Sequence, residues 1–329
     1  MDRIAVIGGG SWGTAISVLL AEKGYDISLW VYEEELVDDI NIKRVNTRYH
    51  PNTILPYKIM ASSDLKEVMD GARYLINAVP SQHTRGVFSR LSSYIGEDVL
   101  IISVSKGIER GSLKTVTEVI KELTGFEASA LSGPSFASEV IQKKPTAVTI
   151  ATRTKETADD LQRLFNTDYF RVYTNSDVLG VELGGALKNV MAIAAGISDG
   201  LGLGLSARAA LITRGLAEMT RLGVAMGAME RTFWGLSGLG DLVLTCTGSL
   251  SRNYTVGFRL GKGEGLKDIL SGMIMVAEGV ATAESAHELS KRYKVEMPIV
   301  EQVYRVIYED KDPMSAVNEL MRRGLKPEY

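Results

Sequence analysis

The first half of the chain alternates short apolar runs, rich in β-branched residues, with longer stretches of helical periodicity. Such alternation is typical of βαβ units, in which parallel strands form a sheet that helices cover. The runs that we expect to form strands are residues 3–8, 26–31, 74–79, 99–104, 128–131, 146–152 and 170–174. We therefore predict an α/β domain with a mostly parallel sheet.

The pattern changes after Asn175 and Ser176, either of which is a suitable helix cap. From there apolar residues recur about every 3.6 positions, which is the period of a helix. The predicted helices are residues 177–197, 206–227, 281–294 and 298–309. Because 329 residues are many for a single core, we expect an α/β domain of residues 1–176 and an all-helical domain of residues 177–329.

A glycine-rich stretch, GGGSWGTA, joins the first predicted strand to a predicted helix at residues 14–24. Its residues Gly8, Gly10 and Gly13 satisfy the pattern G-x-G-x-x-G. The first glycine permits a tight turn, the second lets the backbone approach a pyrophosphate, and the third lets helix and strand pack closely. The amides and the dipole of the helix N-terminus also favour phosphate. The sequence thus predicts a Rossmann-type dinucleotide-binding domain, followed by the all-helical C-terminal domain.

The end of the second predicted strand bears on the choice of cofactor, because the ribose 2′ position is read there. That region is WVYEEE, residues 30–35, in which Tyr32 lies near the strand end. The stretch contains no arginine for a 2′-phosphate, which favours NAD over NADP. Tyr32 could also stack on the adenine, and Lys43 or Arg44 could supply a cation, so the choice between NAD and NADP stays open.

One lysine lies in the most apolar of the predicted helices. Between Glu182 and Asp199 the only charged residue is Lys188. An ammonium in an apolar helix costs free energy unless it has a partner or a task, although lysines often extend their heads into water. From this segment alone, a solvent-exposed Lys188 and a functional, buried Lys188 are equally good interpretations. We expect the variant Lys188→Met to be at least as stable as the wild type, because it removes a buried charge without emptying its volume.

Polar or glycine-rich turns follow several predicted strands, at the edge where open α/β sheets bind ligands. These turns are residues 79–81, 105–107 and 132–135. Lys106 is therefore a candidate for a cation that faces a substrate, although by itself it could be a solvated loop lysine. In the second half, Asp241 alone could be a helix cap, and the sequence SRN at residues 251–253 could be a surface turn.

Composition excludes several classes of function. A net charge of −3 gives no electrostatic footprint for nucleic acid or for an acidic membrane. The single cysteine, Cys246, excludes an internal disulfide, and the three histidines lie too far apart to predict a zinc site. Apolar runs stop short of the roughly 20 residues that span a membrane, and because the first predicted strand starts at Arg3 we expect no leader. We expect a cytoplasmic protein without a membrane span.

Seven stretches, in a fixed order, are similar to those of one enzyme family. They are GGGSWGTA (8–15), VSKGIE (104–109), LSGPSFA (131–137), LGGALKNV (183–190), GLGDLVLTC (238–246), SRN (251–253) and VAEG (276–279). Together they resemble the bacterial-type NAD(P)-dependent glycerol-3-phosphate dehydrogenases over essentially the whole chain. That family reduces dihydroxyacetone phosphate to sn-glycerol 3-phosphate, the backbone of membrane phospholipids. The stretches around Lys188 and Asp241 are specific to it, whereas the glycine loop is not.

The resemblance implies a role for each matching residue. Lys188 would be the catalytic general acid and base, and Lys106 and Asp241 would be the other catalytic residues. The small-molecule substrate would contact Lys106, Gly133, Ser135, Lys188, Asn189, Asp241, Ser251, Arg252 and Asn253. NAD or NADP would contact the loop and strand-end residues Gly8, Gly10, Ser11, Trp12, Gly13 and Tyr32, and also Lys106, Ala137, Arg252, Val276 and Glu278.

Ketone reduction by hydride fits these roles, because negative charge develops on the carbonyl oxygen and must be stabilised and protonated. A buried ammonium does both without a metal, and a carboxylate such as Asp241 would offset its desolvation. Two alternatives are a β-hydroxyacid dehydrogenase and a redox-sensing binding protein that has lost catalysis. The first tends to space its lysine and asparagine apart, whereas Lys188 and Asn189 are adjacent. The apolar helical domain is compatible with a homodimer.

Overall fold

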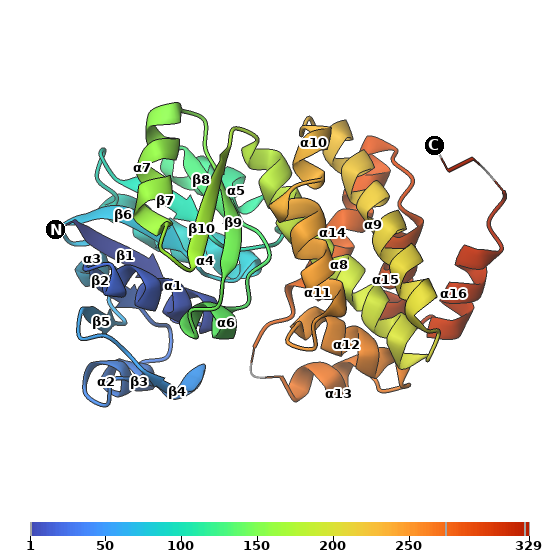
Figure 1. The fold of residues 1–329 in the computed structure, drawn as a ribbon, viewed down its shortest axis with the longest axis horizontal. Helices are drawn as coiled ribbons and strands as arrows, with labels where there is room; N and C mark the ends of the chain where they lie inside the picture. Colours follow the sequence, from blue (N-terminus) through green and yellow to red (C-terminus); the bar gives the residue numbers. More distant parts are fainter. Residues whose placement is uncertain (1, 274, 326, 329) are drawn as a thin grey trace. The chain divides into compact units, whose positions relative to one another are not determined.

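The computed structural model describes residues 2–273, 275–325 and 327–328, and the chain divides into two compact units (Figure 1). The first unit comprises the residues up to Gly107 together with Lys114–Glu182. The second comprises Ile108–Leu113 and the chain from Leu183 onward. The boundary between the two compact units, after Glu182, therefore falls inside the helix Val178–Gly200. The boundary expected from the sequence, between residues 176 and 177, instead follows the change from strands to helices.

The first unit contains an eight-stranded sheet of the order β10-β9-β8-β7-β6-β1-β2-β5. Neighbouring strands are parallel except β8 and β9, which are antiparallel. The strands are β1 (Arg3–Ile7), β2 (Asp26–Trp30), β5 (Ile59–Ser62), β6 (Ala72–Asn77), β7 (Leu100–Ser103), β8 (Ala128–Ser132), β9 (Thr146–Ala151) and β10 (Phe170–Asn175). The strand order reverses between β1 and β6, which is the position where doubly wound sheets bind dinucleotides.

Helices cover both faces of this sheet, as the alternation along β1 shows. Ile4 and Val6 belong to one core cluster, and Ala5 and Ile7 belong to another, because successive side chains of a strand point to opposite faces. The first cluster includes residues of α1 and α7, and the second includes residues of α4 and α5. The helices of this unit are α1 (Ser11–Glu22), α2 (Glu35–Asn41), α3 (Leu65–Met69), α4 (Ser81–Leu91), α5 (Val116–Thr124), α6 (Ala137–Ile141) and α7 (Lys155–Phe165).

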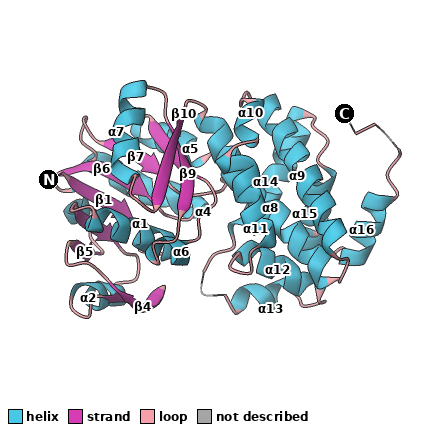
Figure 2. Cartoon of the chain, viewed as in Figure 1, coloured by secondary structure: helices cyan, strands magenta, loops and turns pink. Residues whose placement is uncertain are grey.

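The regular elements that the structure describes in the second unit are all helices, joined by turns and loops (Figure 2). Its elements are α8 (Val178–Gly200) from Leu183 onward, α9 (Leu205–Ala225), α10 (Glu230–Phe233), a π-helical turn at Leu236–Gly240, α11 (Asp241–Thr247), α12 (Arg252–Gly261), α13 (Leu266–Ser271), α14 (Glu278–Tyr293), α15 (Pro298–Tyr308) and α16 (Pro313–Met321). Among the described residues, one helix, α8, is long and apolar enough to cross a membrane, contrary to the expectation that every apolar run is too short. However, 89% of its apolar window is buried inside the protein, which is the behaviour of a core helix.

The structure confirms the predicted strands and the four long helices of the second half, and it adds elements that the periodicity did not predict. The additions include the hairpin of β3 (Val45–Asn46) and β4 (His50–Ile54), the edge strand β5 and the short helices α10 to α13. The residue that caps α8 is Asp177, whose Oδ1 accepts a hydrogen bond from the amide of Gly180 at 2.9 Å. Asn175 instead accepts from the amide of Asp177, so the expected cap was wrong by one or two residues.

Candidate active site

The glycine loop after β1 has the geometry of a phosphate cradle. Gly8 has φ +114°, and a Cβ on Gly13 would lie 1.9 Å from the carbonyl oxygen of Gly8. Both positions therefore require glycine. By contrast, a Cβ on Gly10 would meet nothing within 4 Å, which leaves room for a ligand to approach the backbone. Because α1 starts at the next residue, its amides and its dipole favour an anion at this place.

The other cofactor residues predicted in this unit surround the loop or lie on nearby segments. The hydroxyl of Ser11 lies 3.1 Å from Nε2 of His50. The indole Nε1 of Trp12 is buried without a hydrogen-bond partner among the described residues, so it can donate to a bound group. Tyr32 is 77% exposed at the end of β2, and Ala137 is the first residue of α6. The loop and its unused buried donor thus fit a dinucleotide.

Lys106 is oriented by the turn that follows β8. Its Nζ donates to the carbonyl oxygen of Gly133 at 3.0 Å, and the hydroxyl of Ser135 donates to the same oxygen at 3.0 Å. Gly133 has φ +144°, and a Cβ there would lie 2.9 Å from the Cα of Val148. The structure therefore brings together Lys106, Gly133 and Ser135, which the sequence places about thirty positions apart. Lys106 is a half-buried lysine with a fixed direction, not a solvated loop residue.

Lys188 lies in α8 with its ammonium paired inside the second unit. Its Nζ is 2.5 Å from Oδ1 of Asp241 and 2.7 Å from Oγ1 of Thr245. Lys188 is 6% exposed and Asp241 is fully buried. The snorkelling alternative is thereby wrong for this side chain, since its charge is compensated by a buried carboxylate instead of by water.

Thr245 is a site residue that the sequence reasoning missed. It lies one helical turn after Asp241 in α11, and its hydroxyl also donates to the backbone carbonyl oxygen of Asp241 at 2.6 Å. That bond directs an oxygen lone pair toward Lys188. The spacing of four residues on one helix was the available signal, because residues i and i+4 share a face.

The predicted residues of α12 are a helix start and not a surface turn. Ser251 is the N-cap, and its Oγ accepts from the amide of Tyr254 at 3.2 Å. Asn253 is buried and joins three helices: its Nδ2 donates to Oδ1 of Asn189 at 2.8 Å, and its Oδ1 accepts from the amide of Gly279 at 2.9 Å. These bonds place Arg252, the first residue of α12, at a fixed position relative to α8 and α14.

The helices α8 and α12 touch backbone to backbone. A Cβ on Gly257 would lie 2.0 Å from the carbonyl oxygen of Ile193, and one on Gly196 would lie 2.1 Å from that of Tyr254. Any side chain at these glycines would force the helices apart. The distance between the Lys188 helix and the Arg252 helix is therefore set by glycine. Of the remaining predicted cofactor residues, Glu278 is the first residue of α14, and Val276, just before it, is 47% exposed.

The single cysteine takes no part in this chemistry. Cys246 lies in α11 directly after Thr245 and is fully buried. Burial raises the pKa of its thiol to about 12, so the thiolate is absent near neutral pH. Among the residues that the structure describes, no group of three or more histidine, cysteine, aspartate or glutamate side chains is arranged to hold a metal ion.

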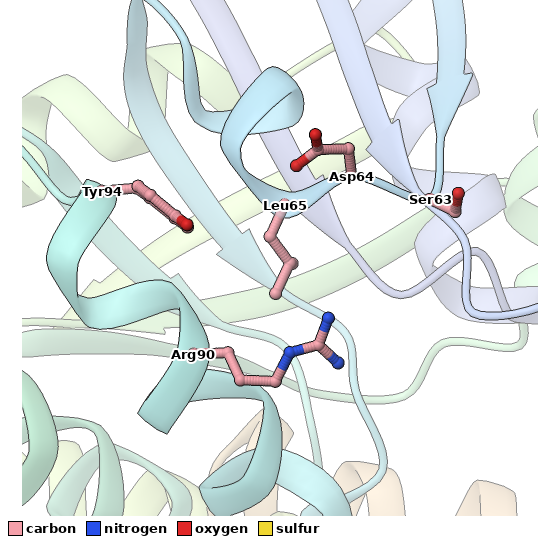
Figure 3. Close-up of a pocket in the computed structure, with 5 residues that line it drawn as sticks. All are labelled: Ser63, Asp64, Leu65, Arg90 and Tyr94. Atoms are coloured by element: carbon pink, nitrogen blue, oxygen red, sulfur yellow. The ribbon is translucent and has the colours of Figure 1, made fainter.

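A surface hollow of about 320 Å³ on the first unit is a separate feature (Figure 3). It is lined by Ser63, Asp64, Leu65, Arg90 and Tyr94, none of which is a predicted site residue. Asp64 caps α3 by accepting from the amide of Lys66 at 2.8 Å. The hollow lies between helix ends and carries no group with a catalytic geometry.

Comparison with known proteins decides between the alternatives that the sequence left open. Residues 3–158 match the profile of the NAD-dependent glycerol-3-phosphate dehydrogenase N-terminus, and residues 177–318 match that of its C-terminus. The chain is 54% identical to the NAD(P)+ glycerol-3-phosphate dehydrogenase of Syntrophotalea carbinolica, with 99% of each chain covered. The chain belongs to the NAD-dependent glycerol-3-phosphate dehydrogenase family. It is an oxidoreductase whose cofactor is NAD or NADP.

Other relatives agree with this family assignment. The NAD(P)+ glycerol-3-phosphate dehydrogenase of Geobacter sulfurreducens is 55% identical over 99% of each chain. A crystal structure of glycerol-3-phosphate dehydrogenase from Coxiella burnetii superposes with a TM-score of 0.95, at 43% identity over 98% of this chain and 99% of that one. The two-domain fold expected from the sequence, a Rossmann-type domain followed by a helical domain, is therefore confirmed. The β-hydroxyacid dehydrogenase and the non-catalytic binding protein are set aside.

Proposed function

We propose that this chain reduces dihydroxyacetone phosphate to sn-glycerol 3-phosphate, with Lys188 as the general acid. The observation that carries the proposal is the buried ammonium of Lys188, held by Asp241 and Thr245. NADH or NADPH supplies the hydride. As the carbonyl oxygen gains negative charge, Lys188 stabilises that charge and transfers a proton to it. In the reverse direction the neutral amine accepts the proton of the hydroxyl.

Asp241 and Thr245 act on Lys188 in different ways. The carboxylate, 2.5 Å from the ammonium, offsets the free-energy cost of burying that charge. The hydroxyl of Thr245 fixes the direction of a second N–H. With these two contacts in place, the donating proton is oriented before a substrate arrives, which lowers the reorganisation that the reaction needs.

Arg252 is proposed to bind the substrate phosphate. A guanidinium can hold phosphate oxygens with two parallel hydrogen bonds, and in a chain of net charge −3 a phosphate needs such a local cation. Ser251, Asn253 and Asn189 are proposed to complete this part of the substrate site. Lys106, Gly133 and Ser135 are proposed as substrate contacts from the first unit, and Lys106 also as a catalytic residue.

The proposed cofactor contacts are the glycine loop with Ser11 and Trp12, Tyr32, Lys106, Ala137, Arg252, Val276 and Glu278. We further propose that the product supplies the backbone of phospholipids and that the enzyme works in the cytoplasm. Support for these two statements is the family resemblance together with the single buried thiol, which suits a reducing compartment. A homodimer is compatible with exposed apolar side chains of the second unit, such as Trp234.

The decisive test is oxidation of NADH with dihydroxyacetone phosphate by wild type and by Lys188→Ala. Loss of a general acid should lower kcat by about 10²–10⁴ while the dissociation constant for NADH stays within twofold. Lys267→Ala, which removes an exposed lysine of α13 in the same unit, should keep wild-type turnover. Near wild-type turnover in folded Lys188→Ala would refute the role of Lys188. Absence of turnover in the wild type would refute the proposed reaction.

A further inference from the structure

The hairpin of β3 and β4 is fastened to the glycine loop. Asn46 is fully buried, and its Nδ2 donates to the carbonyl oxygen of Gly9 and to the hydroxyl of Thr14, both at 2.9 Å. At the other side of the hairpin turn, Nε2 of His50 lies 2.9 Å from the carbonyl oxygen of Ser11. The three residues between these anchors, 47–49, are therefore held in a fixed position beside the loop.

The same hairpin turn reaches the end of β2. Nη1 of Arg48 lies 3.3 Å from Oε1 of Glu33, and the hydroxyl of Tyr49 donates to the same oxygen at 3.0 Å. The Glu33 side chain is 19% exposed and that of Arg48 is 42% exposed. A carboxylate at the strand end is thus held by a cation and a phenol that come from the anchored hairpin, while Arg48 still reaches solvent.

The end of β2 lies directly beside the cofactor loop. The amide of Gly8 donates to the carbonyl oxygen of Trp30 at 3.1 Å, and a Cβ on Gly9 would lie 2.3 Å from Cγ1 of Val31. In this fold the groups that follow β2 meet the ribose next to the adenine. A carboxylate there accepts a hydrogen bond from a 2′-hydroxyl, whereas a 2′-phosphate requires a cation. Glu33 supplies the carboxylate, and Arg48 supplies the cation.

The two other cations near the hairpin have different tasks. Lys43 pairs with Asp39 at 2.6 Å. The guanidinium of Arg44 is buried and donates to the backbone carbonyl oxygens of Leu55, Pro56 and Ile59. Arg44 therefore holds the chain between β4 and β5 in place, and the expectation that Lys43 or Arg44 might serve a 2′-phosphate is not supported by their contacts.

We propose that Glu33 and Arg48 together determine the choice between NADH and NADPH; this inference rests on the proposed function. Glu33 accepts a hydrogen bond from the 2′-hydroxyl of NADH, and the ion pair between Glu33 and Arg48 stays intact. Binding of NADPH requires Arg48 to leave Glu33 and to bind the 2′-phosphate, with the carboxylate still close to that phosphate. Both cofactors bind, and NADH binds more tightly because it leaves the ion pair intact.

The test measures dissociation constants of NADH and NADPH for the full chain by fluorescence titration without substrate. Glu33→Gln removes the charge that opposes the phosphate and should tighten NADPH binding about tenfold while weakening NADH binding by a smaller factor. Arg48→Gln should weaken NADPH binding by about tenfold or more, since hydrogen bonds to charged groups contribute about 1.5–3 kcal/mol, and it should leave NADH binding within twofold. Arg171→Gln, an exposed arginine of β10, is the matched control and should change neither constant.

The inference is judged by the ratio of the dissociation constants of NADH and NADPH in each variant, compared with that ratio in the wild type. Equal losses for both cofactors in Arg48→Gln would mean that the hairpin only shapes the loop, and an unchanged ratio in both variants would mean that the 2′ position is read elsewhere. Either result overturns the inference. Failure of the proposed function is distinguishable, because it appears as missing turnover or missing binding of both cofactors in the wild type.

Discussion

At the scale of single residues, the buried pair of Lys188 and Asp241 dominates the energetics of the site. Each charge alone would cost several kcal/mol to remove from water, and each offsets the cost of the other. The balance is fragile, because removing one partner leaves the other charge buried without compensation. The expectation that Lys188→Met would be at least as stable as the wild type counted only the removal of one buried charge, whereas the pairing with Asp241 at 2.5 Å predicts a loss of stability.

We expect Lys188→Met and Asp241→Asn each to lower the free energy of unfolding by about 3–5 kcal/mol. The double variant Lys188→Met, Asp241→Leu removes both charges and should recover most of that loss. Urea denaturation of the single and double variants, followed by circular dichroism, measures the effect. If Lys188→Met were as stable as the wild type, the buried charge of Asp241 would not need Lys188 to compensate it.

At the scale of elements, two buried glutamates hold helix N-termini. Glu182 of α8 accepts from the amide of Thr117 at 2.9 Å, in the first turn of α5, and Glu218 of α9 accepts from the amide of Ile299 at 2.9 Å, in the first turn of α15. These amides have no partner within their own helices. Burial nevertheless penalises the charged form and raises the pKa of each carboxyl to about 7.

These pKa values predict how stability depends on pH. Each carboxyl binds its proton more tightly in the folded chain than in the unfolded chain, where its pKa is 4.5. The contribution of these groups to stability therefore falls as pH rises from about 4.5 to about 7, and it is constant above that range. We expect Glu218→Gln to reduce the fall in Tm between pH 5.5 and pH 8 by roughly 5 °C.

Scanning calorimetry across this pH range measures the slope. Glu230→Gln, which changes an exposed glutamate of α10, is the control and should keep the wild-type slope. The same slope in Glu218→Gln as in the wild type would contradict the raised pKa of Glu218.

The sequence predicted elements well where periodicity is strong and poorly where tertiary contacts decide. The apolar run at residues 4–7, followed by a glycine turn, and the helical period around Lys188 were assigned correctly. Residues 50–54, HPNTI, carry no alternation, and they form a strand by pairing with β3, next to the contact of His50 with Ser11. Thr245 was missed for a similar reason, since its role exists only once α8 lies against α11. From the sequence we could name the residues of the candidate site, but not the hydrogen-bond partner of each residue.

At the scale of the whole molecule, the two units are interleaved along the chain. The segment Ile108–Leu113 follows β7 of the first unit but packs in the second. The hydroxyl of Ser285 in α14 donates to the carbonyl oxygen of Ile108 at 3.2 Å, and Nε of Arg110 lies 2.7 Å from Oε2 of Glu284. The chain therefore passes between the units three times, and cutting it at a single point does not separate them.

Ile108→Ala should destabilise the helical unit selectively. Ile108 is fully buried, and removing its side chain should cost about 2–5 kcal/mol. We expect amide hydrogen exchange to accelerate at least tenfold in α14 and α15 while β6 and β7 keep their protection. Ile102→Ala, a fully buried residue of β7, is the matched control and should show the opposite pattern. Equal acceleration in both units after Ile108→Ala would contradict the assignment of this segment.

The buried thiol of Cys246 makes local unfolding of α11 measurable by thiol labelling. It is the only sulfhydryl in the chain, it is fully buried, and it lies beside Thr245 on the helix that carries Asp241. A thiol reagent can reach it only while α11 is detached from its neighbours, so the labelling rate counts those detachments directly. Labelling over seconds to hours thus reports how often α11 detaches, without a substrate and without an engineered probe.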